Sequence, residues 1–278
     1  RKWFLSMIND HRKSKVFGGI VLQEFDSIEN KLKGDVYNIF KGSSLGITEG
    51  PHLYKKDGFY YLLTAEGGTE YGHAATIARS KSITGPYTLN PNNPLISSRN
   101  HFDYYLQKCG HADLVQTKDG DWLAVFLTAR PLTPQGNCIM GRETAIETIT
   151  WPKDQWPILG SGSYLPRIEV KIANTPPEKD TLTAEKDDFD APELNINFQS
   201  LRIPVSEDWV SLKLKKGFLC LLGRDSLSST HEQSLLARRI QSLKMTASTS
   251  MNFFPENFQQ MAGLVCYYNT ANFHYLHV

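Results

Sequence analysis

"PHLYKKDGFYYLLTAEG" at residues 51–67 decides the expected fold, because it can be laid over "ADLVQTKDGDWLAVFLTAR" at residues 112–130. Both stretches are typical of a strand, an Asp-Gly turn and a second, aromatic strand. Residues 1–7, "RKWFLSM", resemble the second strand of a third copy, which gives a spacing of about 60 residues per copy. A repeat of this length with about four strands per copy indicates the blades of a β-propeller.

Strand signals also dominate outside the repeat. Short runs of β-branched and aromatic residues predict strands at "GGIVLQEF" (18–25), "AATIARS" (74–80) and "SYLPRIEVKI" (163–172). No long stretch has helical periodicity. We therefore expect an all-β chain.

A second domain is expected beyond "KIANTPPEKDTLTAEKDDFDAPE" (171–193), where the adjacent prolines 176 and 177 and a run of charges predict a linker. We place the boundary so that residues 1–185 form the propeller part and residues 186–278 the second domain. Alternating strand patterns at 209–223, 242–254 and 261–278 predict the beginning of an antiparallel β-sandwich in that second domain.

The bulk composition favours a neutral ligand. The 30 basic and 29 acidic residues leave a net charge of +1, which offers no reason to expect nucleic acid or an anionic membrane as a partner. No apolar run approaches the roughly 20 residues that a membrane-spanning helix needs. The four cysteines, at positions 109, 138, 220 and 266, form no CxxC pair, so buried free thiols are expected rather than a zinc site or a disulfide framework.

Both ends of the sequence stop inside strand-like runs, "RKWFLSM" at the start and "NFHYLHV" (272–278) at the end. We therefore expect a piece of a longer protein. Targeting signals would lie outside such a piece, so the sequence leaves the compartment unknown.

Two ionisable residues occupy the position just ahead of the repeated strand, Glu49 in one copy and His111 in the other. The first strand of each propeller blade lines the central channel, so these residues should meet at one mouth of the axis. A carboxylic acid in a partly enclosed cleft has a raised pKa and can protonate a leaving oxygen, as glycoside hydrolysis requires. The alternatives are a solvated turn acid and a hydrogen-bonded structural histidine.

Four stretches carry a resemblance to a known family: "LGITEGPHLYKKDGFYYLLTAEGGT" (45–69), "GHADLVQT" (110–117), "MGRETAIE" (140–147) and "FPENFQQMAGLVCYYNT" (254–270). They resemble the two-domain β-xylosidases and α-L-arabinofuranosidases of glycoside hydrolase family 43, and the resemblance extends over essentially the whole chain. It implies a five-bladed β-propeller followed by a concanavalin A-like β-sandwich, both partial here.

The resemblance implies that Glu49 is the general acid of an inverting mechanism with three carboxylates. The other two, an Asp general base and an Asp that tunes the pKa of the acid, match nothing in this sequence and are expected before Arg1. The chain as given is therefore expected to lack about two blades and to be inactive by itself. His111 would hydrogen-bond near the acid, and in some members such a histidine also meets a calcium ion. The chemistry itself requires no cofactor.

Three further residues receive substrate roles from the resemblance. Arg142 would pair with the missing pKa-tuning Asp and reach sugar hydroxyls, and the alternative is a surface or interblade salt bridge. Thr69 follows the Gly67-Gly68 turn and would approach the substrate, unless it is a plain turn residue. Asn9 stands where the family commonly has a Trp wall, so it would replace stacking by a hydrogen bond or open the pocket.

The implied activity is that of an exo-β-1,4-xylosidase that releases xylose from xylo-oligosaccharides. One alternative is an α-L-arabinofuranosidase, or an enzyme with both activities, that acts on an arabinose-bearing saccharide. Another is a non-catalytic, carbohydrate-binding propeller. Trp151 and Trp156 are expected to pack at blade edges rather than to serve as sugar platforms. The sequence leaves open whether the protein forms a homo-oligomer.

Overall fold

The computed structural model describes residues 1–12, 16–173 and 186–278, and these residues contain strands and turns but no helix. The chain divides into two compact units, Arg1–Asn174 and Thr175–Val278. Much of the expected linker lies outside the described residues, so the boundary near residue 186 stays a prediction. None of the described residues belongs to a helix long and apolar enough to cross a membrane.

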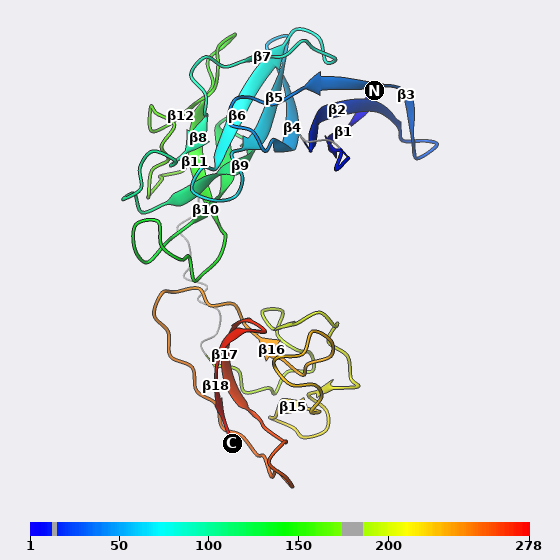
Figure 1. The fold of residues 1–278 in the computed structure, drawn as a ribbon, viewed down its shortest axis with the longest axis vertical. Helices are drawn as coiled ribbons and strands as arrows, with labels where there is room; N and C mark the ends of the chain where they lie inside the picture. The colour runs from blue at the N-terminus through cyan, green and yellow to red at the C-terminus, as the bar shows by residue number, and fades with distance from the viewer. Residues whose placement is uncertain (13–15, 174–185) are drawn as a thin grey trace. The chain divides into compact units, whose positions relative to one another are not determined.

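The described residues of the first unit form three antiparallel sheets that lie side by side (Figure 1). In the first sheet, β1 (Lys2–Asn9), β2 (Phe17–Asp26) and β3 (Lys31–Phe40) follow one another. The second contains β4 (Glu49–Lys56), β5 (Phe59–Glu66), β6 (Ala74–Ser80) and β7 (Thr88–Leu89), and β8 (Ile96–Ser97) also pairs with β6. The third contains β9 (Gln107–Gln116), β10 (Trp122–Ala129), β11 (Glu143–Thr150) and β12 (Ile158–Leu159). Consecutive strands that pair in chain order are the construction of propeller blades, as the repeat predicts.

The repeated Asp-Gly turns differ in length. In the first copy Lys56 pairs with Phe59, and Asp57 and Gly58 have φ angles of 49° and 74°. Positive φ at both central residues is the type I′ hairpin turn, which matches the twist of the strands. In the second copy Gln116 pairs with Trp122 across a longer loop. The sequence repeat therefore predicts the hairpins but not their loop lengths.

Apolar side chains of the second and third sheets share one core. Tyr61 on β5, Phe126 on β10 and Trp151 after β11 are all buried in it. The rings of Tyr61 and Trp151 meet edge to face with centroids 4.8 Å apart. Trp156 stacks on the guanidinium of Arg79, 4.3 Å away. Both tryptophans therefore pack between neighbouring strands and turns, as expected.

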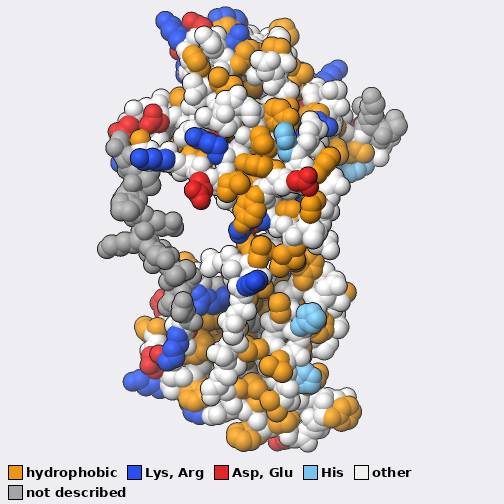
Figure 2. Space-filling model, turned by 90° about the vertical axis from the view of Figure 1, so that its left-hand side faces the viewer, with side chains coloured by type: hydrophobic (Ala, Val, Ile, Leu, Met, Phe, Trp, Pro, Cys, Tyr) orange, Lys and Arg blue, Asp and Glu red, His pale blue; other side chains and the backbone are white. Residues whose placement is uncertain are grey.

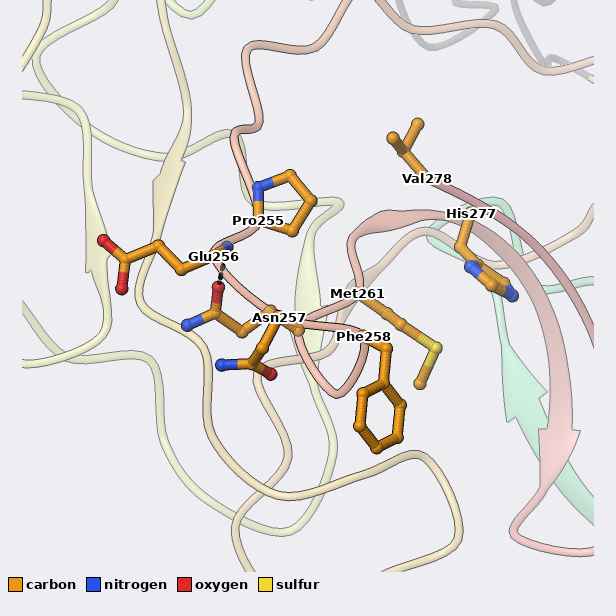
Figure 3. A pocket seen from close by; sticks show the side chains of 8 residues that line it. Pro255, Glu256, Asn257, Phe258, Met261, His277 and Val278 are labelled. Carbon is orange, nitrogen blue, oxygen red and sulfur yellow. Dashed lines mark hydrogen bonds between the residues drawn. The ribbon is translucent and has the colours of Figure 1, made fainter.

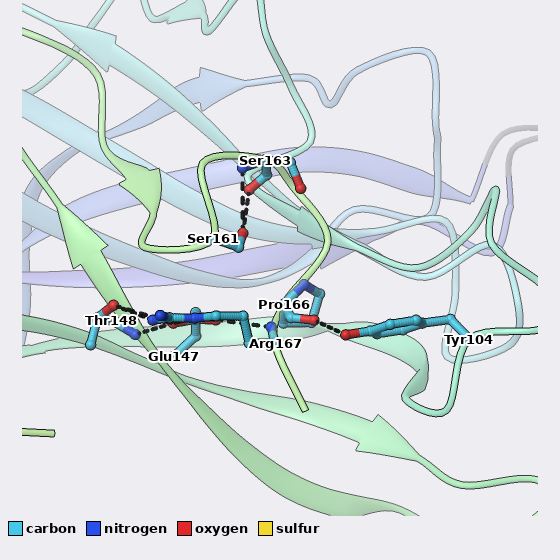
Figure 4. A network of polar contacts seen from close by, with 7 residues as sticks. All are labelled: Tyr104, Glu147, Thr148, Ser161, Ser163, Pro166 and Arg167. Atoms are coloured by element: carbon cyan, nitrogen blue, oxygen red, sulfur yellow. Dashed lines mark hydrogen bonds and ion pairs between the residues drawn. The ribbon is translucent and has the colours of Figure 1, made fainter. Parts of the chain in front are cut away.

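The predicted strand at residues 163–172 is wrong, because side chains rather than a strand ladder hold this segment (Figure 4). The backbone amide of Arg167 donates to the buried Glu147 carboxylate at 2.9 Å, and its guanidinium pairs with the same group. The Tyr104 hydroxyl donates to the Pro166 carbonyl at 2.6 Å. Burial acts to raise the pKa of Glu147, but the hydrogen bonds from Arg167 outweigh it and hold the pKa below its ordinary value. Pro166 itself has no N–H for a ladder.

The second unit contains three short antiparallel pairs among its described residues. They are β13 (Gln199–Ser200) with β16 (Leu236–Ala237), β14 (Val210–Ser211) with β15 (Cys220–Leu221), and β17 (Gly263–Asn269) with β18 (Asn272–His277). The strands expected within 261–278 are confirmed, and they pair with each other as a hairpin. The strand expected at 242–254 is wrong, since this segment forms no ladder with another described segment. An alternating pattern predicts two faces, but a strand also needs a neighbouring backbone.

The cysteines only partly follow expectation. All four are free, and Cys109 is buried, but Cys266 on β17 is exposed. Figure 2 shows acidic, basic and hydrophobic side chains interspersed over the visible face of both units, consistent with the near-zero net charge.

Candidate functional site

Glu49 is the first residue of β4, and a bulge follows it directly. The pairing with β5 steps from Glu49↔Ala65 to His52↔Leu63, which is three steps along β4 against two along β5. Gly50, inside this bulge, has a φ of 53°. A bulge re-aims the neighbouring side chain and is frequent next to active sites.

His111 occupies a similar bulge in the next blade. The pairing of β9 with β10 steps from Ala112↔Phe126 to Gly110↔Leu127, so His111 is the extra residue. Its φ of 44° is uncommon for a residue with a side chain. The two bulges bring the Nδ1 atom of His111 to 3.9 Å from the Oε1 atom of Glu49, and the two side chains are 40% and 34% exposed. The structure thus brings together the two residues that the repeat places at one mouth.

The close approach of the His111 ring to the backbone requires a glycine at position 50. A Cβ atom added to Gly50 would lie 2.5 Å from the Nε2 atom of His111, inside any normal contact distance. The imidazole therefore lies directly over the backbone that follows Glu49. Glu49 thus supplies the acid, and Gly50 leaves room for the His111 ring.

His73, just before β6, is a site residue that sequence reasoning missed. It is 1% exposed, and its Nδ1 atom donates to the Lys108 carbonyl at 2.9 Å, since a carbonyl can only accept. Its Nε2 atom is buried and has no hydrogen-bond partner among the described residues. Burial lowers the pKa of His73, and the nearby charges of His111 and Arg142 act in the same direction, whereas the Lys108 carbonyl and Glu49 oppose the shift.

A sequence signal for His73 does exist. Gly-His-Ala occurs at residues 72–74 and again at 110–112. The rings of His73 and His111 lie 6.5 Å apart, and a Cβ atom on Gly110 would come within 2.7 Å of the His73 ring. The second Gly-His-Ala therefore contacts the first.

Arg142, the third predicted site residue, is exposed and directly precedes β11. It makes no hydrogen bond or ion pair with another described residue, so the salt bridge considered as its alternative is absent from that part of the chain. Its charge is one of those that lower the pKa of His73. Arg142 therefore belongs to the same electrostatic neighbourhood as Glu49 and His111.

Thr69 and Asn9 are the remaining predicted site residues. Thr69 is half-buried in the loop between β5 and β6, and this loop is tied to the loop ahead of Glu49 by a hydrogen bond from the Gly67 amide to the Gly46 carbonyl at 2.8 Å. Asn9 is exposed at the end of β1, where the pairing with β2 is irregular. No hydrogen bond or ion pair between described residues joins Asn9 or Thr69 to the side chain of Glu49.

The described residues do not form a calcium ligand set. No group of three or more His, Cys, Asp or Glu side chains in these ranges is placed to hold a metal ion. Calcium prefers six to eight oxygen ligands, and the two imidazoles beside Glu49 offer nitrogen instead. The suggested calcium ion thus stays a prediction, and the proposed reaction does not depend on it.

Two hollows formed by described residues lie away from Glu49. One, of about 320 Å³, lies in the second unit between the segment Pro255–Met261 and the end of β18 (Figure 3). Glu256 supplies the acidic side chain among the residues that line it, and this side chain points away from the labelled apolar residues Phe258 and Met261 (Figure 3). Among the described residues, Glu49, His111 and His73 converge at the Glu49 bulge instead, as a catalytic site would require.

Two family models match the chain: glycosyl hydrolases family 43 over residues 1–157, and the β-xylosidase C-terminal concanavalin A-like domain over residues 186–278. A β-xylosidase of Bacillus subtilis is 47% identical over 100% of this chain and 54% of its own length. Xylosidase/arabinosidase 43B of Humicola insolens is 44% identical over 100% of this chain and 51% of its own length. The crystal structure of xylan β-1,4-xylosidase from Bacillus halodurans C-125 superimposes with a TM-score of 0.92 at 48% identity, over 100% of this chain and 53% of that one. The chain thus spans about half the length of these relatives.

Proposed function

Because the chain belongs to glycoside hydrolase family 43, we propose that the full-length protein of which it is part is an inverting, exo-acting β-1,4-xylosidase. In this proposal Glu49 is the general acid. The observation that carries the proposal is the Glu49–His111 pair, in which bulges of two neighbouring blades bring a carboxylate and an imidazole to 3.9 Å. The relatives named as β-xylosidases support the choice of substrate.

In the proposed reaction Glu49 gives its proton to the glycosidic oxygen as the bond from that oxygen to the anomeric carbon breaks. A water molecule attacks the anomeric carbon from the opposite face and loses a proton to a second carboxylate. In inverting enzymes the two carboxyl groups stand roughly 6.5–9.5 Å apart, which leaves room for the water. We assign the base, and the Asp that tunes the acid, to chain preceding Arg1.

His111 and Arg142 are proposed to support this chemistry. His111 lies over the backbone beside Glu49 and limits the directions that the carboxyl group can take. Arg142 has no partner among the described residues, and its fork of donors suits sugar hydroxyls and a carboxylate. Thr69 is proposed to contact the sugar from the adjoining loop, and Asn9 to line the pocket.

The general-acid role is tested by Glu49→Ala in the full-length gene product. Turnover of xylobiose, whose leaving group needs a proton, should fall by about 10²–10⁴-fold. Turnover of 2,4-dinitrophenyl β-xyloside should change far less, because its leaving group departs without protonation. Unchanged turnover of xylobiose would refute the assignment. The first product observed by proton NMR should be α-xylose if the configuration is inverted.

The proposed exo action and the need for the upstream base can be measured together. From xylohexaose the full-length protein should first give xylose and xylopentaose, and early formation of xylobiose, xylotriose or xylotetraose would contradict exo action. The 278-residue chain alone, with its folding checked by circular dichroism, should not hydrolyse 4-nitrophenyl β-xyloside. Activity in the shorter chain would mean that its base lies within residues 1–278.

A second candidate is α-L-arabinofuranosidase activity, alone or beside the first. The name xylosidase/arabinosidase of a relative that is 44% identical supports it. The ratio of turnover on 4-nitrophenyl α-L-arabinofuranoside and 4-nitrophenyl β-xyloside separates the two. A full-length protein that binds xylo-oligosaccharides but hydrolyses neither glycoside would instead be a carbohydrate-binding propeller.

A further inference from the structure

Glu66 is a fully buried carboxylate that the proposed reaction does not use. It is the last residue of β5, and it is 0% exposed. Among the described residues no Lys, Arg or His forms an ion pair with it. A buried charge is costly unless it is well hydrogen-bonded, so its partners show what holds it in place.

Three residues donate four hydrogen bonds to Glu66. Its Oε1 atom accepts from the Ser43 amide at 2.8 Å and from the Thr48 hydroxyl at 2.7 Å. Its Oε2 atom accepts from the Ser43 hydroxyl and, at 3.0 Å, from the Thr76 hydroxyl. All four donors are neutral groups, and together they can satisfy a carboxylate.

Two of these partners lie in the loop that leads into Glu49. Ser43 and Thr48 stand near the two ends of the loop between β3 and β4, and Thr48 directly precedes Glu49. Thr48 is 1% exposed, and a Cβ atom on Gly42 would come within 2.4 Å of its hydroxyl oxygen. The Glu66 carboxylate therefore fixes both ends of the loop that leads into the bulge.

The strand pairing adds a second constraint at the same place. Ala65, the neighbour of Glu66, pairs with Glu49, so the backbone of β5 holds one side of the bulge. The Thr48 hydroxyl holds the other side through the Glu66 carboxylate. Glu49 needs such a constraint because Gly50, which follows it in the bulge, has a positive φ and can adopt many backbone conformations.

We propose that Glu66 is a positioning residue for the general acid, and that its hydrogen bond from Thr48 fixes the direction in which Glu49 leaves β4. This inference rests on the proposed function of Glu49. It assigns no contact with substrate to Glu66 or Thr48. It implies that, once the Thr48 hydroxyl is removed, the Glu49 carboxyl group is no longer held in the position that proton transfer requires.

The test is Thr48→Val in the full-length gene product, which keeps the shape of the side chain and removes its hydroxyl. Turnover of xylobiose should fall by about tenfold or more, while turnover of 2,4-dinitrophenyl β-xyloside should stay within about threefold of the wild type. Thr48→Ser keeps the hydroxyl and should restore turnover of xylobiose.

Thr76→Val is the matched control. It removes one hydroxyl donor from the same carboxylate, but Thr76 lies on β6 and does not lead into Glu49. Its two turnover numbers should therefore change in equal proportion or not at all. If Thr48→Val does not fold, Thr48→Ala, which leaves room for water beside Glu66, is used for the same comparison.

Equal losses on both substrates in the Thr48 variants, or no loss, would overturn the inference. Glu49→Ala, measured beside them, keeps this outcome separate from the proposed function. If Glu49→Ala selectively lowers turnover of xylobiose and Thr48→Val does not, only the positioning role fails. If Glu49→Ala shows no such selectivity, the general-acid assignment itself fails.

Discussion

The hydroxyl of Tyr54 on β4 joins the inner strands of two neighbouring blades: it donates to the Asp113 carboxylate on β9 and accepts from the Leu114 amide at 2.8 Å. His52 approaches the same carboxylate at 3.5 Å. These contacts lie a few residues beyond Glu49 and His111 on the same two strands. A hydrogen-bonded junction between the two blades thus lies close to the candidate acid and its histidine.

Tyr54→Phe should destabilise the first unit by about 1–3 kcal/mol, because the Leu114 amide loses its acceptor and Asp113 loses a donor. Urea unfolding of the full-length protein measures this. Tyr60→Phe, on the neighbouring β5, is the control, since no hydrogen bond from its hydroxyl to another described residue is present. Equal stability of the two variants would show that the junction contributes nothing.

Gly50→Ala should lower turnover of xylobiose by about tenfold or more, because the new methyl group would meet the His111 ring at 2.5 Å. Gly58→Ala is the matched control. Gly58 also has a positive φ, 74°, but a Cβ atom there meets nothing within 4 Å. Both variants carry backbone strain; they differ in the contact with His111 and in that Gly50 directly follows Glu49. Similar turnover in both would exclude a role for this contact.

His73 should make the protein less stable at acidic pH. Its pKa is lowered in the folded state, chiefly by burial, from an ordinary value of 6.5. Below that pH the unfolded chain binds a proton that the folded chain does not, so the free energy of unfolding falls as the pH falls, by at most about 1.4 kcal/mol per pH unit.

The His73 effect is measured with His73→Asn, whose amide can still donate to the Lys108 carbonyl. Urea unfolding at pH 7, 6 and 5 should show a shallower loss of stability in this variant than in the wild type. His11→Asn, at an exposed position, should keep the wild-type slope. A His73→Asn slope equal to that of the wild type would contradict the pKa shift.

Arg167→Met should destabilise the first unit at neutral pH, because it leaves the Glu147 carboxylate buried without its cation. The pKa of Glu147 is held below 4.5, so the stabilisation by the pair is complete above that value and is lost as the pH falls through the folded-state pKa. The difference between wild type and variant in urea unfolding should therefore shrink below about pH 4.5. Lys118→Met, which removes an exposed charge, should show no such pH dependence.

Features carried by local pattern were predictable from the sequence. Alternation and β-branched runs predict β1, β2, β5, β6 and β10, and Asp57-Gly58 predicts the hairpin, because both depend on the few residues involved. The segment at 163–172 has the same pattern and forms no strand, since Pro166 and the Arg167–Glu147 pair determine how it packs. A pattern records which face is apolar, but not whether a partner strand is available.

At the candidate site, the order of residues already shows which groups are present: an acid before Gly50, a histidine at the equivalent place in the next copy, and a second Gly-His-Ala. The tertiary structure alone brings Glu49 and His111 to 3.9 Å, buries His73 so that its pKa is lowered, and encloses Glu66 with Ser43 and Thr48. Glu66 ends an apolar strand and looks in the sequence like an ordinary exposed strand end. Its burial depends on a loop from the preceding sheet folding over it, and such long-range packing leaves no periodic mark in the residues themselves.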